Sequence, residues 1–294
     1  MSRILLSAFA DEAAQDLAGQ VAALQANQIT GIELRAVDTV NIADFDRDMT
    51  NRVRIALQAG GITVTCLATP LGKKEISDPL APEIERVKRL SGTAHALDCS
   101  KLRIFSFYVP AGQAAVYRDE VMLRLDRMIE TAEAEGVRLY HENEKDIFGD
   151  VLERCVDIHT TFNKRLGAIL DPANYIQVGS DPLAAIQQLD PWVEYLHIKD
   201  CRRSDGHIVK AGSGDGQIAR ILEQFLRNPL RQSVAMEPHL FEFASLKQLE
   251  KHMSGTPGSG KDVGVGGDYP DALTAFATGV GAFRQIAADQ GVIV

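Results

Sequence analysis

The sequence predicts an α/β protein folded as a single (β/α)8, or TIM, barrel. Eight short runs of apolar and β-branched residues recur along the chain, and their starts lie 27, 31, 40, 35, 30, 26 and 40 residues apart. One βα unit of such a barrel takes roughly 31 residues, so these spacings fit one unit each. The segments between the runs have the periodicity of helices. A length of 294 residues is also sufficient for one complete barrel.

Each candidate strand is short and apolar, which is typical of the buried strands of a parallel sheet. The eight runs begin at Ile4, Gly31, Ile62, Leu102, Val137, Gly167, Val193 and Ser233. The fourth run is read as LRIFSFYV, a strand of eight residues. Because periodicity alone does not close a sheet into a barrel, a doubly wound open sheet is the alternative architecture.

Helices are expected between these runs because apolar residues recur there three and four positions apart. One such stripe consists of Ile218, Ile221, Leu222, Phe225 and Leu226. The last helix is expected to bury Leu273, Phe276, Ala277, Val280 and Phe283. Glycines at 60–61 and 136 precede strands, where a left-handed glycine commonly ends a helix.

No change in composition divides the chain, so one domain is expected over residues 1–294. A Gly-rich loop is expected at about residues 254–268, between the last strand and the last helix. In a barrel this loop would lie at the C-terminal face, where active sites are built. A cover for the site and an insertion without function are both open interpretations. The segment GTPGSGKD (255–262) nearly matches a phosphate loop, but Asp262 stands where Ser or Thr is required.

Composition and charge exclude several classes of function. The chain has 31 Lys and Arg against 40 Asp and Glu, a net charge of −9, which argues against nucleic acid or an anionic membrane as partner. No apolar run approaches the ~20 residues of a membrane span, and the N-terminus has no signal-peptide pattern. The four cysteines form no C-x-x-C pair, so a reducing cytoplasm is the expected location.

Side chains that bind divalent metals lie at the ends of the last four candidate strands. They are Glu142, Asp171, His197 and Glu237. Because barrel strands are parallel, these ends meet at one mouth. A single charge at a strand end often only faces water, but four consecutive strands favour a function. Three carboxylates and one imidazole suit one divalent ion such as Mn²⁺, Mg²⁺, Co²⁺ or Zn²⁺.

Several motifs resemble the sugar phosphate isomerase/epimerase family, whose members are xylose isomerase-like TIM barrels. The motifs are LDPANY (170–175), HIKDCRR (197–203), GSGDGQI (212–218), MEPH (236–239), HENEKDIFGD (141–150) and GIELR (31–35). The resemblance implies that the four strand-end residues bind one divalent metal. It also implies that Glu142 and Glu237 form the acid/base pair that removes and returns a proton next to a carbonyl.

Five further residues are candidate substrate contacts. Arg203 matches a substrate-binding arginine of the epimerases, although an exposed loop arginine is the alternative. Asn174 stands where many ketose epimerases have histidine. Glu144, Lys199 and His239 each lie two positions after a proposed ligand. For each of the three there is an alternative. Glu144, instead of Glu142, is the other candidate metal ligand of the segment HENE. Lys199 is equally well interpreted as a residue that orients Asp171 or lies at the surface, and His239 as a hydrogen-bonded structural histidine.

The sequence therefore predicts a metal-dependent isomerase or epimerase of a ketose, sugar phosphate or related polyol. The alternative is a lyase similar to inosose or dehydroshikimate dehydratases, because both reactions begin with abstraction of the same proton. An endonuclease of the same barrel class is disfavoured by the acidic charge, and a non-catalytic barrel by the complete ligand set. The expected partner is a small sugar or polyol, with no nucleic acid and no membrane. A homo-oligomer is a further expectation from the resemblance.

Overall fold

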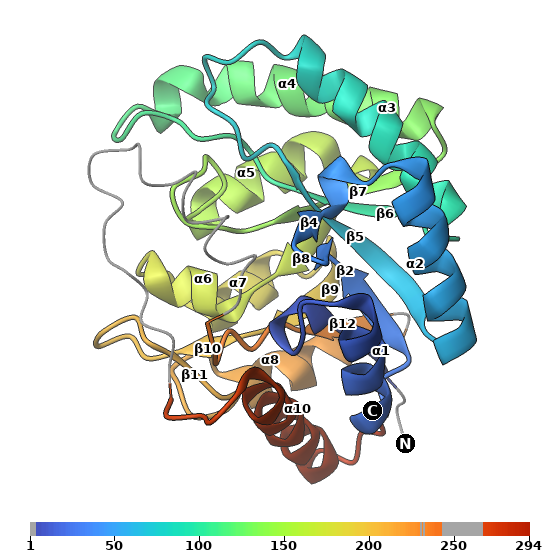
Figure 1. The fold of residues 1–294 in the computed structure, drawn as a ribbon. Coiled ribbons are helices and arrows are strands. Elements are labelled where there is room, and N and C mark those ends of the chain that lie inside the picture. The colour runs from blue at the N-terminus through green and yellow to red at the C-terminus, as the bar shows by residue number, and fades with distance from the viewer. Residues whose placement is uncertain (1–3, 230, 232, 243–266) are drawn as a thin grey trace.

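A computed structural model describes residues 4–229, 231, 233–242 and 267–294 of the chain. Eight parallel strands form the barrel: β1 (Leu5–Ala8), β2 (Gly31–Leu34), β5 (Thr63–Leu71), β6 (Lys101–Ile104), β7 (Arg138–Glu142), β8 (Gly167–Leu170), β9 (Val193–Ile198) and β12 (Ser233–Met236). Their order is β1-β12-β9-β8-β7-β6-β5-β2, and β1 pairs with both β2 and β12. The sheet is therefore closed (Figure 1), which confirms the predicted fold class and rules out the open sheet.

Helices surround the barrel and connect its strands (Figure 1). They are α1 (Leu17–Ala26), α2 (Arg47–Gly60), α3 (Ala81–Ala96), α4 (Ala114–Ala134), α5 (Leu152–Phe162), α6 (Pro172–Gln177), α7 (Pro182–Gln188), α8 (Ile218–Phe225) and α10 (Ala272–Asp289). Two small hairpins lie outside the barrel, β3 (Ala36–Val37) with β4 (Val40–Asn41) and β10 (Asp200–Cys201) with β11 (Ile208–Val209). Gly61 and Gly136 have positive φ and follow α2 and α4, in agreement with the helix ends expected there.

The fourth predicted strand is shorter than expected. It ends at Ile104, and the apolar run that follows it belongs to a loop. Phe107 is buried with a φ of 68°, a left-handed conformation that no strand contains. Its N–H donates to the carbonyl of Gly72 instead of to a neighbouring strand. The aromatic residues of this loop are buried, so their apolar sequence resembles that of a buried strand.

The buried face of α10 also differs from the expected stripe. Phe276, Val280 and Phe283 are buried as predicted, but Leu273 is 52% exposed and Ala277 is exposed as well. The rest of the buried face consists of the small residues Ala275, Gly279 and Ala287. A Cβ at Gly279 would lie 2.8 Å from the Pro238 side chain, so the helix packs where its side chains are smallest. A count of large apolar residues could not detect this face.

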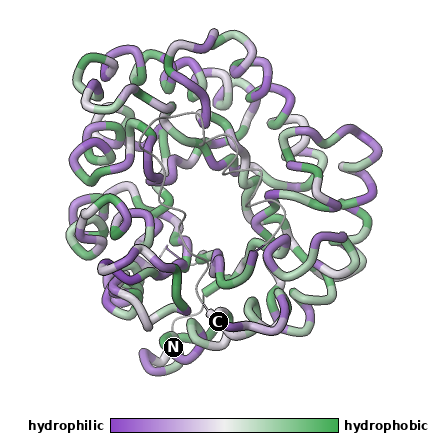
Figure 2. The backbone as a smooth tube through the Cα atoms, turned by 60° about the vertical axis from the view of Figure 1, so that its left-hand side comes forward, coloured by the Kyte–Doolittle hydropathy of each residue, from purple (hydrophilic) through white to green (hydrophobic). Residues whose placement is uncertain are grey.

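The buried apolar side chains of the described residues form four clusters, and two of them, a larger and a smaller part, make up the core of the barrel. The larger part lies between the barrel and its helices, and in Figure 2 the chain forms a closed ring with the helices on its outside. The smaller part joins residues from six places around the barrel: Phe9, Ala68, Tyr140, Ile169, Tyr195 and Ala235. Because side chains alternate between the two faces of a strand, these residues fill the barrel interior. We call this group the interior plug.

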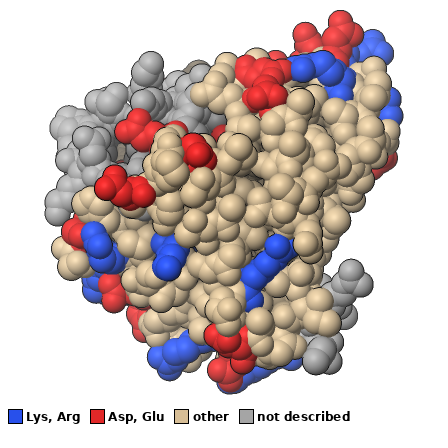
Figure 3. Space-filling view, turned by 60° about the horizontal axis from the view of Figure 1, so that its bottom comes forward, with Lys and Arg blue, Asp and Glu red and all other residues tan. Residues whose placement is uncertain are grey.

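The two ends of the described chain meet, because the N–H of Ile4 donates to the carbonyl of Ile293 at 2.9 Å. The Gly-rich loop expected at about 254–268 lies outside the described residues, apart from its last two positions. None of the helices that the structure describes is long and apolar enough to cross a bilayer. On the face shown in Figure 3, basic side chains are interspersed with acidic ones.

Candidate metal and catalytic site

The four proposed metal ligands lie one layer above the interior plug. Four plug residues are each followed, two positions later, by one proposed ligand: Tyr140 by Glu142, Ile169 by Asp171, Tyr195 by His197 and Ala235 by Glu237. Residues two apart on a strand point to the same side, so all four ligands point toward the barrel axis. One atom of each lies within 4.8 Å of the others, and all four residues are buried.

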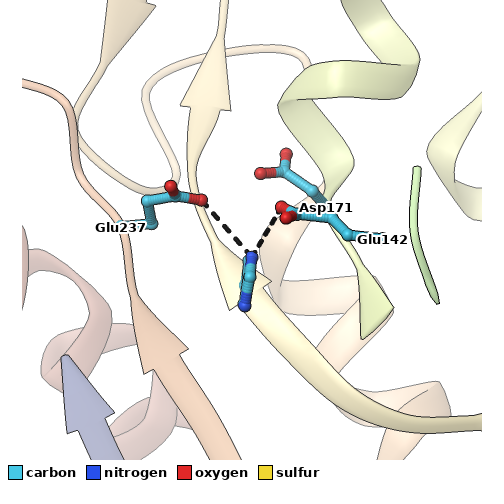
Figure 4. Close-up of side chains that lie close together, drawn as sticks. Glu142, Asp171 and Glu237 are labelled. Carbon is cyan, nitrogen blue, oxygen red and sulfur yellow. Dashed lines mark hydrogen bonds and ion pairs between the residues drawn. The ribbon is translucent and has the colours of Figure 1, made fainter. Parts of the chain in front are cut away.

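His197 is at the centre of this cluster. Its Nδ1 lies 2.7 Å from Glu142 Oε1 and 3.3 Å from Glu237 Oε2. Figure 4 shows the two glutamates approaching this one nitrogen from two directions. Its Nε2 lies 3.1 Å from Glu33 Oε1, and the Phe9 ring meets the imidazole edge-on at 5.2 Å. The imidazole therefore has polar partners at both nitrogens and a perpendicular aromatic ring beside it.

The carboxylates of the cluster differ in their pKa. Burial favours the neutral acid and would raise the pKa of Glu142. The nearby positive charges, that of His197 foremost, together have the larger effect, however, and the pKa of this carboxyl is lowered. At Glu237 burial is likewise outweighed, chiefly by Lys199, and the pKa lies well below its ordinary value. At Asp171 burial prevails over Lys199 and raises the pKa to about 6. Both glutamates are therefore ionised at neutral pH.

A metal ion fits this donor set. Glu142 Oε2, Asp171 Oδ2 and Glu237 Oε2 are buried, and none accepts a hydrogen bond of good geometry from the described residues. Cationic groups are nevertheless near: Lys199 Nζ lies 2.8 Å from the Asp171 oxygen and 3.6 Å from that of Glu237. Buried carboxylate oxygens that lack a good donor are suited to bind a cation.

Lys199 contacts the cluster, and Glu144 lies close enough to Lys199 to interact with its charge. Lys199 is 5% exposed and is paired with Asp171. Glu144 pairs with Lys73, whose Nζ lies 2.9 Å away. Burial would raise the pKa of Glu144, but Lys73 and further lysines lower it to about 2. Glu144 is thus a fixed anion next to the cluster.

The other three candidate substrate contacts have different surroundings. Asn174 is buried at the start of α6, where its N–H donates to Asp171 Oδ1 and its side-chain amide to the carbonyl of Asn143. His239 Nε2 lies 3.3 Å from Glu237 Oε1, at the edge of the cluster. Arg203 is exposed. Its side chain donates to the carbonyl of Ser180, and its backbone N–H donates to Asp215 Oδ2.

Three charged residues of the site were not identified from the sequence. Arg103 on β6 is buried, and its Nη1 lies 3.1 Å from Glu142 Oε2. Arg35, directly after β2, donates to Glu237 Oε1 at 3.0 Å. Glu33 on β2 contacts His197. A signal was present in the sequence, because a charge inside an otherwise apolar strand needs a buried partner.

The GSGDG motif has a structural explanation. The N–H groups of Gly212, Gly214 and Gly216 donate to the carboxylate of Asp200 at 2.9, 3.0 and 2.8 Å. A Cβ at Gly214 would lie 2.4 Å from Asp200 Oδ1. The glycines therefore permit the loop to close around Asp200, which lies directly after Lys199.

Comparison with known proteins agrees with the fold. The model of a family described as xylose isomerase-like TIM barrel matches residues 21–254. None of the curated proteins matches the chain. A probable 3-DHS dehydratase, AsbF of Bacillus anthracis, is 20% identical with a TM-score of 0.66, over 86% of this chain and 98% of its own.

Two further solved structures have the same fold. D-psicose 3-epimerase of Clostridium cellulolyticum, solved with D-tagatose, is 14% identical with a TM-score of 0.71, over 96% of this chain and 98% of its own. The IolI protein, solved with a zinc atom, is 16% identical with a TM-score of 0.71, over 97% of this chain and 99% of its own. At these identities the likeness concerns the fold alone.

Proposed function

The chain belongs to the xylose isomerase-like TIM barrel family, and on that basis we propose that it is a metal-dependent isomerase or epimerase of a ketose, sugar phosphate or related polyol. The observation that carries the proposal is the buried cluster of three carboxylates and one imidazole at the ends of four consecutive barrel strands. The sugar epimerases among the solved structures with this fold give further support.

Glu142, Asp171, His197 and Glu237 would hold one divalent ion, of the Mn²⁺, Mg²⁺, Co²⁺ or Zn²⁺ kind. When bound, such an ion stabilises negative charge on a substrate oxygen next to the carbon that loses its proton. The zinc atom in the IolI structure supports a metal in a barrel of this kind. The described residues supply the oxygen and nitrogen donors that these ions prefer.

Glu142 and Glu237 would act as the acid/base pair. Both carboxylates are ionised at neutral pH, and they approach the same nitrogen, His197 Nδ1, from two directions (Figure 4). A substrate carbon between them would lose its proton to one carboxylate and receive a proton from the other on its opposite face. This arrangement suits an epimerase, because epimerisation returns a proton to the face opposite the one that lost it.

The remaining candidates would bind the hydroxyl groups of the substrate. Lys199 and Glu144 lie beside the cluster and offer a donor and an acceptor, and His239 adjoins Glu237. Asn174 would act from the first turn of α6. Arg203 would have to exchange its contact with Ser180 for one with the substrate.

A lyase that removes water β to a carbonyl is the second candidate. It would use the same cluster and begin with the same proton abstraction. The observation in its favour is the probable 3-DHS dehydratase among the structures with this fold. Ultraviolet absorbance separates the two reactions, because dehydration produces a conjugated or dicarbonyl product and epimerisation does not.

Metal removal tests the proposal directly. Chelation should abolish turnover of a panel of ketoses and their phosphates, and Mn²⁺, Co²⁺ or Mg²⁺ should restore it. Asp171→Ala and His197→Ala should bind less metal and keep their helical circular dichroism, because the interior plug lies below the site. His207→Ala, which removes an exposed imidazole outside the cluster, should bind metal normally. Full activity of metal-stripped protein would refute the proposed site.

Isotope exchange tests the acid/base pair. In D₂O the product should gain deuterium at the abstracted carbon. Glu142→Gln and Glu237→Gln should each lower the rate by about 10²–10⁴, and the metal content of each variant separates loss of the base from loss of a ligand. Substrate deuterated at that carbon should show a primary isotope effect in a single turnover. A hydride shift, observed directly, would contradict the two-glutamate mechanism.

The expected cytoplasmic location remains part of the proposal. All four cysteines are buried and free, as they would be in a reducing compartment.

A further inference from the structure

The guanidinium group of Arg35 lies among three carboxylates beside the proposed metal cluster. Arg35 is 1% exposed. Its Nε and Nη2 donate to the two oxygens of Asp11 at 2.9 Å each. Nη2 also lies 3.2 Å from Glu12 Oε1, and Nη1 donates to Glu237 Oε1 at 3.0 Å. One buried cation thus neutralises part of the negative charge of carboxylates from both ends of the chain.

Two of these oxygens belong to a second group with ligand chemistry. Glu12, Glu237 and His239 each offer one ligand atom, and these atoms lie within 4.8 Å of one another. His239 Nε2 is 3.2 Å from Glu12 Oε1 and 3.3 Å from Glu237 Oε1. Two carboxylates and an imidazole often hold a divalent cation. Glu237 is shared, since its Oε1 belongs to this group while its Oε2 faces His197.

Arg35 and a divalent cation would compete for this second group. A metal ion would bind the two carboxylate oxygens at about 2.0–2.2 Å, but guanidinium nitrogens already lie 3.0 and 3.2 Å from these oxygens. Two cations this close in a buried site would repel each other strongly, because little water screens them. These two oxygens can therefore bind either Arg35 or a divalent ion, but not both at once.

We propose that Arg35 is a fixed cation that takes the place of a second divalent ion, so that the chain binds one ion only. Arg35 is also a positioning residue for Glu237. It holds Oε1 and leaves Oε2 directed at the first cluster, 3.3 Å from His197 Nδ1 and 3.6 Å from Lys199 Nζ. The inference rests on the proposed function, because it assumes an ion at the first cluster.

The test counts the Mn²⁺ ions that metal-free protein binds, by calorimetric titration and by metal analysis after desalting. We expect one ion per chain in the wild type and two in Arg35→Ala, where Glu12, Glu237 and His239 become available. Arg35→Ala combined with His239→Ala should return to one. Arg124→Ala is the matched control and should stay at one, because Arg124 is also a buried, ion-paired arginine but belongs to the outer helix α4.

A conservative variant separates the positioning role from the ion count. Arg35→Lys keeps the positive charge but loses the planar fork that binds two partners at once. It should bind one Mn²⁺, with an affinity about 10–100-fold below that of the wild type. Wild-type affinity in Arg35→Lys would overturn the positioning role.

Two variants that keep Arg35 test the count even if Arg35→Ala does not fold. Glu12→Gln and His239→Ala should each still bind one ion. A wild-type count of two that falls to one in either variant would overturn the proposal, and so would a folded Arg35→Ala that binds only one. A wild type that binds no Mn²⁺ would refute the proposed function together with this inference, whereas the other outcomes leave the first site intact.

Discussion

At the scale of the residue, His197 shows how the site depends on a side chain behind the proposed ligands. Its Nδ1 faces the two glutamates, and its Nε2 faces Glu33, which is fully buried on β2. A carboxylate at Nε2 keeps a proton on that nitrogen, so that Nδ1, which faces Glu142 and Glu237, can release its own proton and bind a metal. Glu33 therefore has a role that the strand-end pattern of the sequence did not indicate.

Replacing Glu33 tests this role. Glu33→Gln keeps the shape of the side chain but allows the amide to donate to Nε2, so His197 loses its fixed orientation and tautomer. We expect the Mn²⁺ affinity to fall by about 10–100-fold, measured by calorimetric titration. Glu194→Gln is the control, because Glu194 pairs with Arg138 near the other end of the barrel. Equal affinity in Glu33→Gln and the wild type would show that His197 needs no such partner.

At the scale of the element, the loop between β11 and α8 is shaped by one carboxylate. Asp200 accepts three N–H groups from the glycines of GSGDG, and Arg203 at the same rim is held through its N–H by Asp215. The hairpin β10–β11 begins directly after Lys199. These hydrogen bonds therefore fix the conformation of the segment that follows β9, next to the cluster.

A pair of glycine substitutions tests how closely this loop is packed. An alanine Cβ at Gly214 would lie 2.4 Å from Asp200 Oδ1 and 2.5 Å from the carbonyl oxygen of Cys201, so the loop must shift. We expect Gly214→Ala to lower the free energy of unfolding by about 1–3 kcal/mol in urea denaturation. Gly281→Ala in α10 is the control: apart from the backbone of the helix itself, no described atom would lie within 4 Å of the added Cβ, and helix propensity predicts a gain of up to ~1 kcal/mol. Equal effects of the two substitutions would contradict this account.

At the scale of the whole molecule, stability depends on contacts between distant parts of the chain. β1 closes the barrel by pairing with β12, and Ile4 is bonded to Ile293. Between the barrel and α5, the His159 ring lies edge-to-face with the buried His141 ring at 5.7 Å and stacks on the half-buried Trp192 ring at 6.1 Å. His159 is 1% exposed, so a proton on this ring would place a charge in the core.

This burial predicts a loss of stability in acid. Burial lowers the pKa of His159 from 6.5 to about 4. Above pH 6.5 the ring is neutral in both states, and as the pH falls toward 4 the unfolded chain takes up a proton that the folded chain does not. The free energy of unfolding should therefore decrease across this window, by roughly 3 kcal/mol from this group.

Urea denaturation between pH 7 and pH 4 measures this contribution. His159→Phe keeps an aromatic ring but cannot bind a proton, so its stability should decrease less over the window than that of the wild type. Trp192→Phe disturbs the same stack without removing a titrating group and should keep the wild-type slope. If all three proteins lose stability in parallel, the acid sensitivity arises elsewhere.

The sequence predicted the barrel and the convergence of four strand-end residues because both depend on local patterns. Strand starts recur at the interval of one βα unit, and alternation along a strand determines that Glu142, two positions after Tyr140, points to the same side. The sequence pattern overestimated the length of the fourth strand and wrongly assigned Leu273 and Ala277 to the buried face of α10. In both cases apolar residues were packed by neighbours that are distant in the sequence, such as Gly72 and Pro238.

By itself, the sequence determined that this chain forms a barrel, and it placed side chains of metal-ligand type above an apolar interior. Only the tertiary structure decided which charged residues lie against these side chains. Arg35 is 24 residues from Asp11 and 202 residues from Glu237, yet it binds both, and Glu33 reaches His197 across 164 residues. No periodicity connects such positions, because these contacts exist only after the strands have been arranged around one axis. The geometry of closure, rather than any local pattern, places each buried charge beside its partner.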